Sequence, residues 1–307
     1  MQGLDLQSAD AVCDALHAGA AANRSASCRR GSIDVVEAPG RLVATGDLHD
    51  NPVHFARLVH AAGLGRAPGV PDEEGEAELP DPAHLTLHEI IHSDRFMNGM
   101  DFSYRALARV AALKAEHPEH VHTLLANHEL AQIVGAGIVK HGVRVVEAFN
   151  AAVEFAFGDD HERVTAAIDA FVRSMPIGLR CVCPAGDILC AHSLPGLAMM
   201  GRFDPTILSR DLTDDDYAPR TGSAHLMVWG RGYDAEQLED LTERWGINLF
   251  VLGHEHAEHG YALVEPNALV LNSDHGRGVY LPIDLDHKPR LRECPALVQR
   301  LDGAPTF

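Results

Sequence analysis

The chain of 307 residues contains 25 Lys or Arg and 44 Asp or Glu, which gives a formal net charge of −19. Hydrophobic residues make up 46% of it and charged residues 22%, a globular composition that excludes a disordered tail. No apolar run approaches the roughly 20 residues that a membrane-spanning helix needs. The start of the chain is acidic where a secretory signal would be basic, so we expect neither export nor a membrane partner. The acidic excess also argues against binding of long nucleic acids, which requires a basic face.

The cysteines and histidines of the chain differ in what they indicate. The 6 cysteines form no Cys-x-x-Cys pair, which argues against a zinc ribbon or a thioredoxin-like motif. We interpret them as reduced thiols and predict a cytoplasmic protein. Histidine is abundant, with 20 residues, several of them next to Asp, Asn or Glu. We therefore expect the metal-binding and catalytic residues to include several of these histidines.

Short β-prone runs recur along the chain, at first alternating with helical patterns and later following one another. This order predicts an α/β protein with one large mixed sheet or two packed sheets. In chain order, the predicted strands are 42–45, 85–87, 121–125, 179–183, 188–191, 226–229, 249–252, 268–271 and 279–281.

Three stretches between the strands have helical patterns. Asn51 can cap a helix and Pro52 suits its first turn, so the first helix is expected to reach Leu64. Asp101 is expected to cap the second helix, in which apolar residues recur at helical spacing. Residues 130–175 are expected to form a helical lobe over one rim of the site.

The remaining segments predict the outline of the domain. Residues 1–40 are expected to be a peripheral helix and loop, 41–290 the main domain, and 291–307 a C-terminal tail. Within the domain, residues 66–83 are rich in Pro, Gly and acid, which predicts a surface loop overhanging another rim of the site.

Five short segments share one character: each follows a predicted strand and carries residue types that bind metals. Ligand sites of α/β proteins are assembled at such strand ends. The residues offer carboxylate, amide and imidazole groups and no thiolate, a set that suits Mn²⁺, Fe²⁺ or Zn²⁺. They exceed what one ion needs, which predicts two ions sharing a carboxylate, as in phosphoester hydrolysis. The residues are Asp47, His49, Glu89, Asn127, His128, Glu129, His192, His254 and His256.

The order Gly-Asp-x-His, acidic residue, Asn-His-Glu, His and Gly-His-x-His resembles the calcineurin-like metallophosphatase superfamily. It is most similar to the branch of serine/threonine phosphoprotein phosphatases and diadenosine tetraphosphatases. The resemblance covers about residues 41–284, and it includes Trp229-Gly230-Arg231 and the segment 271–276. For the fold, it implies two packed mixed β-sheets flanked by helices, the four-layer sandwich of metallophosphatases.

The resemblance also implies a role for each site residue. The ligands would be Asp47, His49 and His256 for one divalent ion, Asn127, His192 and His254 for the other, and Glu89 as the bridge. A hydroxide between the ions would attack phosphorus, and His128 would protonate the leaving oxygen as general acid. Arg231 and Arg95 would hold the phosphoryl oxygens. The substrate would be a phosphorylated protein, a nucleotide or a small phosphoester, and Mn²⁺ is the ion expected in vitro.

Two positions depart from the family's pattern. The second motif of the family is Gly-Asp-x-x-Asp-Arg, whereas residues 88–95 read His-Glu-Ile-Ile-His-Ser-Asp-Arg. We take Glu89 as the bridging carboxylate, with Asp94 as the alternative, and His92 stands where the family has the Asp that orients the general acid. Ala126 replaces a Gly, and a positive φ there would strain it by about 1 kcal/mol.

Two other functions stay open at this stage. Residues 88–92 also match His-Glu-x-x-His, the zinc-protease motif, in which His88 and His92 would share one face of a helix and Glu89 would activate water. Glu116 could then serve as a distant third ligand, although the β-branched residues of the segment favour a strand end. The third function is a catalytically inactive metal-binding or phosphate-binding module on the same fold.

Overall fold

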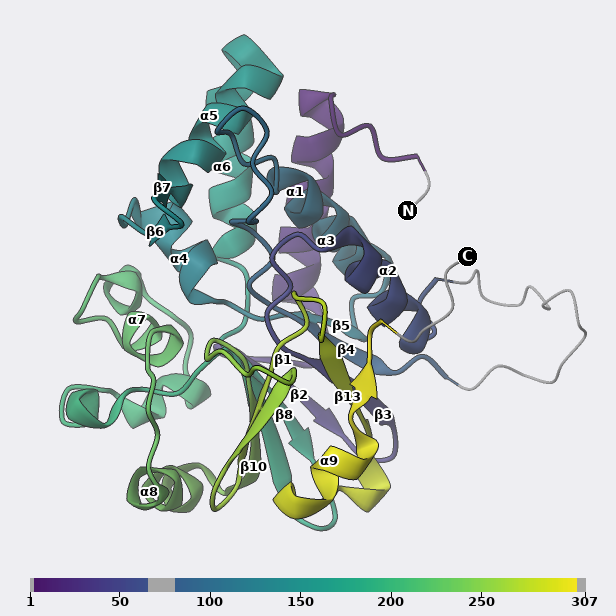
Figure 1. The fold of residues 1–307 in the computed structure, drawn as a ribbon, viewed down its shortest axis with the longest axis vertical. Helices are drawn as coiled ribbons and strands as arrows, with labels where there is room; N and C mark the ends of the chain where they lie inside the picture. Colours follow the sequence, from purple (N-terminus) through teal and green to yellow (C-terminus); the bar gives the residue numbers. More distant parts are fainter. Residues whose placement is uncertain (1–2, 66–80, 303–307) are drawn as a thin grey trace, which may run out of the picture.

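The computed structural model describes residues 3–65 and 81–302, which form two β-sheets with helices around them (Figure 1). The larger sheet has the strand order β1-β2-β8-β9-β10-β12-β11, and the smaller one has the order β14-β13-β3-β4-β5. The larger sheet contains β1 (Arg29–Arg30), β2 (Ile33–Glu37), β8 (Gly178–Val182), β9 (Asp187–Ala191), β10 (Ile247–Leu252), β11 (Tyr261–Val264) and β12 (Ala268–Leu271). The smaller sheet contains β3 (Arg41–Thr45), β4 (His84–Leu87), β5 (Val121–Thr123), β13 (Val279–Asp284) and β14 (Gln299–Arg300).

Successive side chains of a strand alternate between two apolar cores, and this alternation creates the sandwich. In β3, Leu42 and Ala44 belong to the core between the two sheets, whereas Val43 packs in the core formed with the helices. In β10, Val251 belongs to the core between the sheets, and Phe250 packs in the core formed with the helices. Successive side chains of a strand point to opposite faces, so a strand that is apolar at every position must be covered on both sides. Each sheet therefore packs with one face against the other sheet and with its other face against an outer layer of helices.

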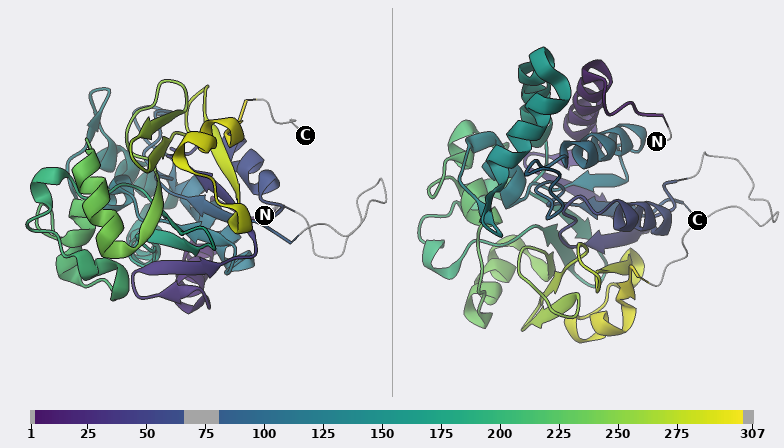
Figure 2. Two further views of the ribbon diagram at one scale, coloured as in Figure 1. Left: turned by 90° about the horizontal axis from the view of Figure 1, so that it is seen from below. Right: turned by 45° about the horizontal axis from the view of Figure 1, so that its top comes forward.

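The helices form two groups on either side of the sheets (Figure 2). In Figure 1, α1 to α6 gather in the upper half of the molecule, and α7 and α8 lie at the lower left. A small hairpin, β6 (Val139–Lys140) with β7 (Val143–Arg144), precedes α5. The helices are α1 (Ala9–Ser25), α2 (Pro52–Ala61), α3 (Tyr104–Glu116), α4 (Asn127–Val134), α5 (Val145–Phe157), α6 (His161–Val172), α7 (Ser223–Val228), α8 (Ala235–Trp245) and α9 (Cys294–Leu297).

Local signals in the sequence place several helices correctly. The Asn51 side chain accepts a hydrogen bond from the backbone N–H of His54, and Pro52 occupies the first turn of α2, as expected. Asp101 lies about one turn before α3, which begins at Tyr104. Its carboxylate accepts hydrogen bonds from the backbone N–H and the hydroxyl of Ser103. The expected helical lobe is present as α4, α5 and α6. The predicted loop 66–83 lies outside the described residues except at 81–83.

Three expectations about the outline of the fold need correction. The segment 226–229 was expected to be a strand but lies mostly in α7, because a short buried apolar run fits either structure. Residues 1–40 were expected to be peripheral, yet β2 pairs in parallel with β8 inside the larger sheet. The apolar, β-branched character of β2 is the signal that this expectation overlooked. In the expected C-terminal tail, β14 pairs with β13.

All six cysteines are free and buried. None of the helices within the described ranges is both long enough and apolar enough to cross a membrane.

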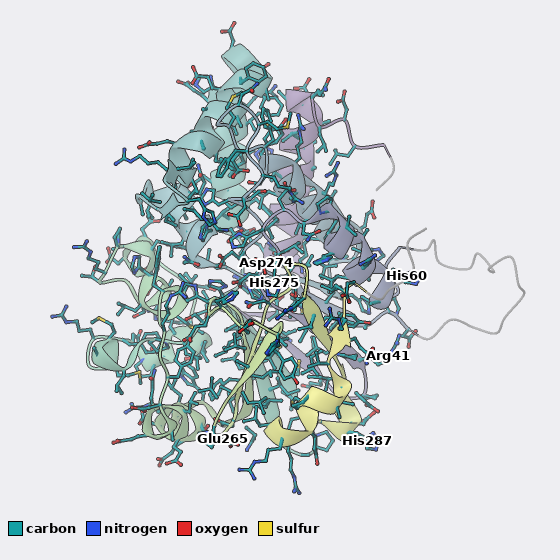
Figure 3. All side chains as sticks on the ribbon, viewed as in Figure 1. Arg41, His60, Glu265, Asp274, His275 and His287 are labelled. Atoms are coloured by element: carbon teal, nitrogen blue, oxygen red, sulfur yellow. The ribbon has the colours of Figure 1, made fainter. Side chains whose placement is uncertain are left out.

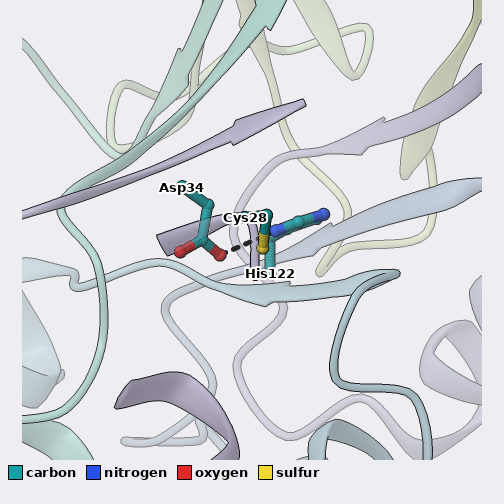
Figure 4. Close-up of side chains that lie close together, drawn as sticks. All are labelled: Cys28, Asp34 and His122. Atoms are coloured by element: carbon teal, nitrogen blue, oxygen red, sulfur yellow. Dashed lines mark hydrogen bonds and ion pairs between the residues drawn. The ribbon is translucent and has the colours of Figure 1, made fainter. Parts of the chain in front are cut away.

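A buried ion pair connects the two sheets. His122 Nδ1 on β5 lies 2.7 Å from Asp34 Oδ2 on β2, and neither side chain is more than 1% exposed (Figure 4). Burial by itself would raise the pKa of Asp34, but the hydrogen bond from His122 and the nearby charges of Lys114 and Arg29 hold it below its ordinary value. Cys28 lies beside the pair, and burial raises the pKa of its thiol to about 12. The ionised Asp34 thus balances buried positive charge at the sheet interface.

Replacing this carboxylate tests how much the ion pair stabilises the fold. Asp34→Asn should lower the free energy of unfolding by about 3 kcal/mol at pH 7, because buried cations lose their counter-charge. The pKa of Asp34 is depressed by folding, so its stabilising effect is present above the unfolded value of about 3.9 and is lost as the pH falls through the folded value. In urea unfolding, the difference in the free energy of unfolding between wild type and variant should therefore become smaller from pH 7 to about pH 3.5.

Asp14→Asn, at an exposed position of α1, is the matched control and should change the free energy by less than about 0.5 kcal/mol. If the free energies of unfolding of wild type and Asp34→Asn differed equally at both pH values, the stabilisation could not be assigned to the ionised Asp34.

Candidate metal centre

The candidate site lies where the two sheets meet at the ends of five strands. Asp47, Glu89 and Asn127 follow β3, β4 and β5 of the smaller sheet, and His192 and His254 follow β9 and β10 of the larger one. All five side chains are buried. These strands are parallel within each sheet, so their carboxyl ends meet at one edge. The fold thereby brings together residues that are far apart in the sequence.

His192 is the centre of one group of potential ligand atoms. Its Nε2 lies 2.8 Å from Glu89 Oε2, 2.7 Å from Asn127 Oδ1 and 3.0 Å from His254 Nδ1. One imidazole nitrogen carries a single proton and cannot donate to all of these atoms at once. A cation, in contrast, attracts oxygen and nitrogen lone pairs from several directions. The buried Nε2 of His254 has no hydrogen-bond partner, which leaves a further nitrogen at the site that a metal could bind.

The second group lies at the other oxygen of Glu89. Its Oε1 is 2.8 Å from His49 Nε2 and 3.5 Å from His128 Nε2. His49 Nδ1 lies 3.1 Å from the backbone oxygen of Ile91, so Nδ1 carries a proton, and Nε2 is the nitrogen that faces Glu89 and that a metal could bind in place of a proton. The two oxygens of Glu89 therefore face two different sets of imidazoles.

Asp47 is held beside the first of these groups by the backbone. The N–H of His254 lies 2.9 Å and 3.0 Å from its two carboxylate oxygens, and His192 Nδ1 lies 3.4 Å from Oδ1. A side chain at Gly253 would collide with this carboxylate, since an added Cβ would be 2.3 Å from Asp47 Oδ1. The glycine of the Gly-His-x-His motif is needed here for close approach of the two loops.

The electrostatics of the centre require positive charge. Burial opposes a charge on His192, but Glu89 and Asp47 raise its pKa to about 10. In the same way, Glu89 outweighs burial and raises the pKa of His49 to about 9. Burial opposes the ionised form of Glu89, yet His128, His192 and His49 hold its pKa well below the usual range. Protons on imidazoles balance two buried carboxylates, and divalent cations can supply the same charge, so the residues fit a metal site.

The predicted general acid is positioned by another histidine. His92 Nε2 lies 3.0 Å from Gln132 Oε1, an acceptor, so Nε2 carries the proton and Nδ1 is left as an acceptor. His92 Nδ1 lies 2.9 Å from Nδ1 of His128, which therefore donates. Nε2 of His128 is consequently the nitrogen that faces Glu89. A neutral imidazole thus occupies the orienting position for which the resemblance implies a carboxylate.

Some predicted residues lie at the rim or outside the cluster. The guanidinium of Arg231 donates to the backbone oxygen of His254 at 2.9 Å, which places it next to the centre. Arg95 is 54% exposed, with Nη2 3.5 Å from Asp50 Oδ2. Asp94 is exposed and pairs with Lys140 at 3.0 Å, so Glu89 and not Asp94 enters the cluster. His256 is exposed, and its ring centroid lies 5.9 Å from that of His275, labelled near the centre of Figure 3.

The zinc-protease motif does not have the geometry that its chemistry needs. The residues 88–92 are not helical, and φ is +46° at Glu89 and +60° at His92. His88 Nδ1 lies 3.1 Å from His192, whereas His92 contacts His128, so the two imidazoles do not share one face. The expectation of strain at Ala126 is also wrong, because its φ is −118°.

Two buried residues support the centre in ways that sequence reasoning missed. His88 Nε2 lies 2.9 Å from the backbone oxygen of Thr45 and its Nδ1 3.5 Å from Asp47 Oδ1. Glu129 Oε1 accepts from the N–H groups of Ile90 and Ile91 at 2.6 Å and 3.2 Å. Burial, with the charge of Glu89, raises the pKa of Glu129 to about 7. The Asn-His-Glu motif was the signal for Glu129, although its partner could not be inferred.

Backbone strain is concentrated in these loops. Most non-glycine residues avoid positive φ, which costs of order 1–3 kcal/mol when the surroundings enforce it. Within the described ranges, eight non-glycine residues have positive φ, and five of them lie in the loops of the centre. These five are His49, Asp50, Glu89, His92 and His254.

Comparisons with known proteins support the fold. No protein-family model and no curated protein matches the chain. Among solved structures, it is similar to a protein serine/threonine phosphatase from Saccharomyces cerevisiae with similarity to human phosphatase PP5. The TM-score is 0.62 at 14% identity, over 90% of this chain and 83% of that one. It is also similar to a cold-active protein-tyrosine phosphatase of the psychrophile Shewanella sp., with a TM-score of 0.58 at 14% identity, over 91% and 83% of the two chains. These likenesses confirm the predicted fold class.

The position of Glu89 generates a test of the ligand set. Glu89→Gln keeps the shape of the side chain but removes its negative charge, so it should weaken Mn²⁺ binding by at least about 100-fold. Asp94→Asn removes a carboxylate from the exposed pair with Lys140 and should leave Mn²⁺ affinity unchanged. Titration calorimetry, with metal analysis of the dialysed proteins, measures both effects.

Circular dichroism would establish that both variants are folded. Loss of Mn²⁺ from Asp94→Asn but not from Glu89→Gln would reverse the assignment of the two carboxylates.

Proposed function

We propose that the protein is a metal-dependent phosphoester hydrolase, a phosphomonoesterase of the protein-phosphatase type with a dinuclear metal site. The observation that carries this proposal is the arrangement of Glu89, whose two oxygens face His49 on one side and His192 on the other at 2.8 Å each. A carboxylate between two sets of imidazole and amide ligands is suited to bridge two cations. The likeness in fold to two solved phosphatases supports the same function.

The ligand sets would draw on both groups of the centre and on Asp47, whose carboxylate lies 3.4 Å from His192 Nδ1. Asp47, His49 and Glu89 would hold one ion, and Glu89, Asn127, His192 and His254 would hold the other. When bound, the two ions would supply an activated water and neutralise charge on the phosphoryl group. We do not include His256, because its side chain is exposed and belongs to none of the groups of potential ligand atoms found among the described residues.

The protein's own groups would then position the phosphoester and move a proton. Arg231, next to His254, would bind phosphoryl oxygens with its planar guanidinium. His128, whose Nδ1–H donates to His92, would deliver a proton from Nε2 to the leaving oxygen when its ring is doubly protonated, while His92 and Gln132 fix the ring. Arg95 would act only at the rim, in keeping with its exposure.

Removing the proposed general acid should separate metal binding from turnover. His128→Ala should retain bound Mn²⁺ yet slow hydrolysis of p-nitrophenyl phosphate by about 10²–10⁴-fold, because the leaving oxygen loses its proton donor. His141→Ala, at a 76% exposed position, is the matched control and should keep wild-type activity. Loss of metal from His128→Ala would make this residue a ligand instead of an acid.

The first experiment on the wild-type protein is metal stoichiometry together with hydrolysis of p-nitrophenyl phosphate and bis-p-nitrophenyl phosphate. About two Mn²⁺ per chain with turnover of the monoester is the expected result. Turnover of the diester alone would contradict the monoesterase assignment. Two bound ions without turnover would point to an inactive binding module, in which the imidazole of His92 in place of a carboxylate has removed catalysis.

His254→Ala should abolish turnover through loss of metal, because Nδ1 of His254 lies 3.0 Å from the nitrogen of His192 at the centre of the ligand group. Metal analysis of the same sample distinguishes this cause from misfolding, which circular dichroism would detect. Full activity of His254→Ala would overturn the proposed ligand set.

A further inference from the structure

A second pocket lies beside the candidate metal centre, on the side of α7. It has a volume of about 380 Å³, within the range of small-molecule sites. Arg231 and Trp229 connect it to the centre: the Arg231 guanidinium reaches the backbone of His254, and the ring centroids of Trp229 and His254 lie 6.4 Å apart. The pocket therefore lies next to the metal centre, with Arg231 and Trp229 between them.

The pocket gathers positive charge that no carboxylate of residues 3–65 and 81–302 pairs with directly. Three arginines, Arg202, Arg220 and Arg231, line it. No carboxylate of the described part of the chain lies within 4 Å of their guanidinium groups. Arg210 and Arg244, on other parts of the surface, do have such partners, at 2.7 Å from Asp216 and Asp240.

This arrangement is unexpected in a protein with a net charge of −19, in which acids outnumber Lys and Arg by 44 to 25. Three guanidinium groups without a described carboxylate partner around one cavity are an anion-binding arrangement, because a guanidinium can bind phosphoryl oxygens with two parallel hydrogen bonds.

The floor of the pocket adds aromatic surface and a neutral donor. The rings of His225 and Trp229 are stacked, with centroids 5.6 Å apart and planes at 20°. The backbone N–H of Arg220 donates to His225 Nδ1, which leaves the proton of the neutral ring on Nε2. Burial, with the charge of Arg220, lowers the pKa of His225 and keeps it neutral. An organic group can therefore pack against the rings while an anion contacts the arginines.

We infer that this pocket binds a second anionic group of the substrate, so that the preferred substrate is a small organic molecule with two phosphoryl groups. One phosphoryl group would occupy the metal centre, and the other would bind Arg202 and Arg220, with Arg231 between the two positions. This inference rests on the proposed function for the identity of the reaction. It adds the substrate class, which the ligands of the metal centre do not determine.

The test compares alkane-diol bisphosphates of three to eight carbons with the matching alkyl monophosphates, with phosphate release as the assay on the Mn²⁺-loaded protein. The best bisphosphate should have a kcat/KM at least about tenfold above that of its monophosphate, mainly through a lower KM, since each additional charged contact contributes of order 1.4 kcal/mol or more. In Arg202→Ala/Arg220→Ala, the ratio of the two kcat/KM values should fall to about one.

Arg292→Ala is the matched control, because Arg292 is exposed, pairs with Glu265 and does not line the pocket. It should keep the wild-type ratio. Equal kcat/KM values for bisphosphates and monophosphates in the wild type, or a ratio unchanged in the double variant, would overturn the inference.

A binding experiment separates this inference from the proposed function. If no monophosphate is hydrolysed, the proposed function fails, but calorimetric titration of the metal-free protein with the bisphosphates still examines the pocket. Binding that is weakened at least tenfold in the double variant would support the pocket even then. Binding that is absent, or equal in wild type and double variant, would reject it.

Discussion

The burial of two carboxylates, Asp47 and Glu89, between the ends of two β-sheets is the constraint on which the centre depends. A buried carboxylate is costly unless positive charge or N–H donors surround it. His49 and His192 lie 2.8 Å from the oxygens of Glu89, and the N–H of His254 faces both oxygens of Asp47. The same need for positive charge makes the cluster suitable for divalent cations, which compete with protons for these lone pairs.

The loops of the centre keep these side chains in place at a cost in backbone strain. Glu89 lies at a positive φ, and its two oxygens face His49 and His192. The buried Glu129 binds the two N–H groups that follow Glu89 and so fixes this turn. Strain of this kind persists only where the surrounding structure enforces it, and it is common at functional sites. The turn at Glu89 is thus supported by its own set of contacts.

The charge distribution around the centre is uneven. The chain as a whole is strongly acidic, yet Arg202, Arg220 and Arg231 line a pocket next to His254 without a nearby carboxylate among the described residues. An acidic surface that repels anions elsewhere would direct a small anionic molecule toward such a pocket. The pocket therefore places positive charge directly beside the centre, which is the basis of the substrate class inferred above.

The sequence by itself determined which residue types end the central strands. Asp47, Asn127, His192 and His254 each follow a short β-prone run, and polar metal-binding residues in that position form a local pattern that is visible without coordinates. The alternation that builds both sheets is local as well, because successive side chains of a strand point to opposite faces.

Only the tertiary structure decided how these strand ends meet. It selected Glu89 over Asp94, turned 226–229 into part of α7, and left His256 outside the cluster. It also gathered three arginines from separate loops around one pocket. The physical reason is the same in each case: the direction of a loop side chain and the structure of a short apolar run depend on contacts with distant segments, and these contacts exist only once the two sheets have packed together.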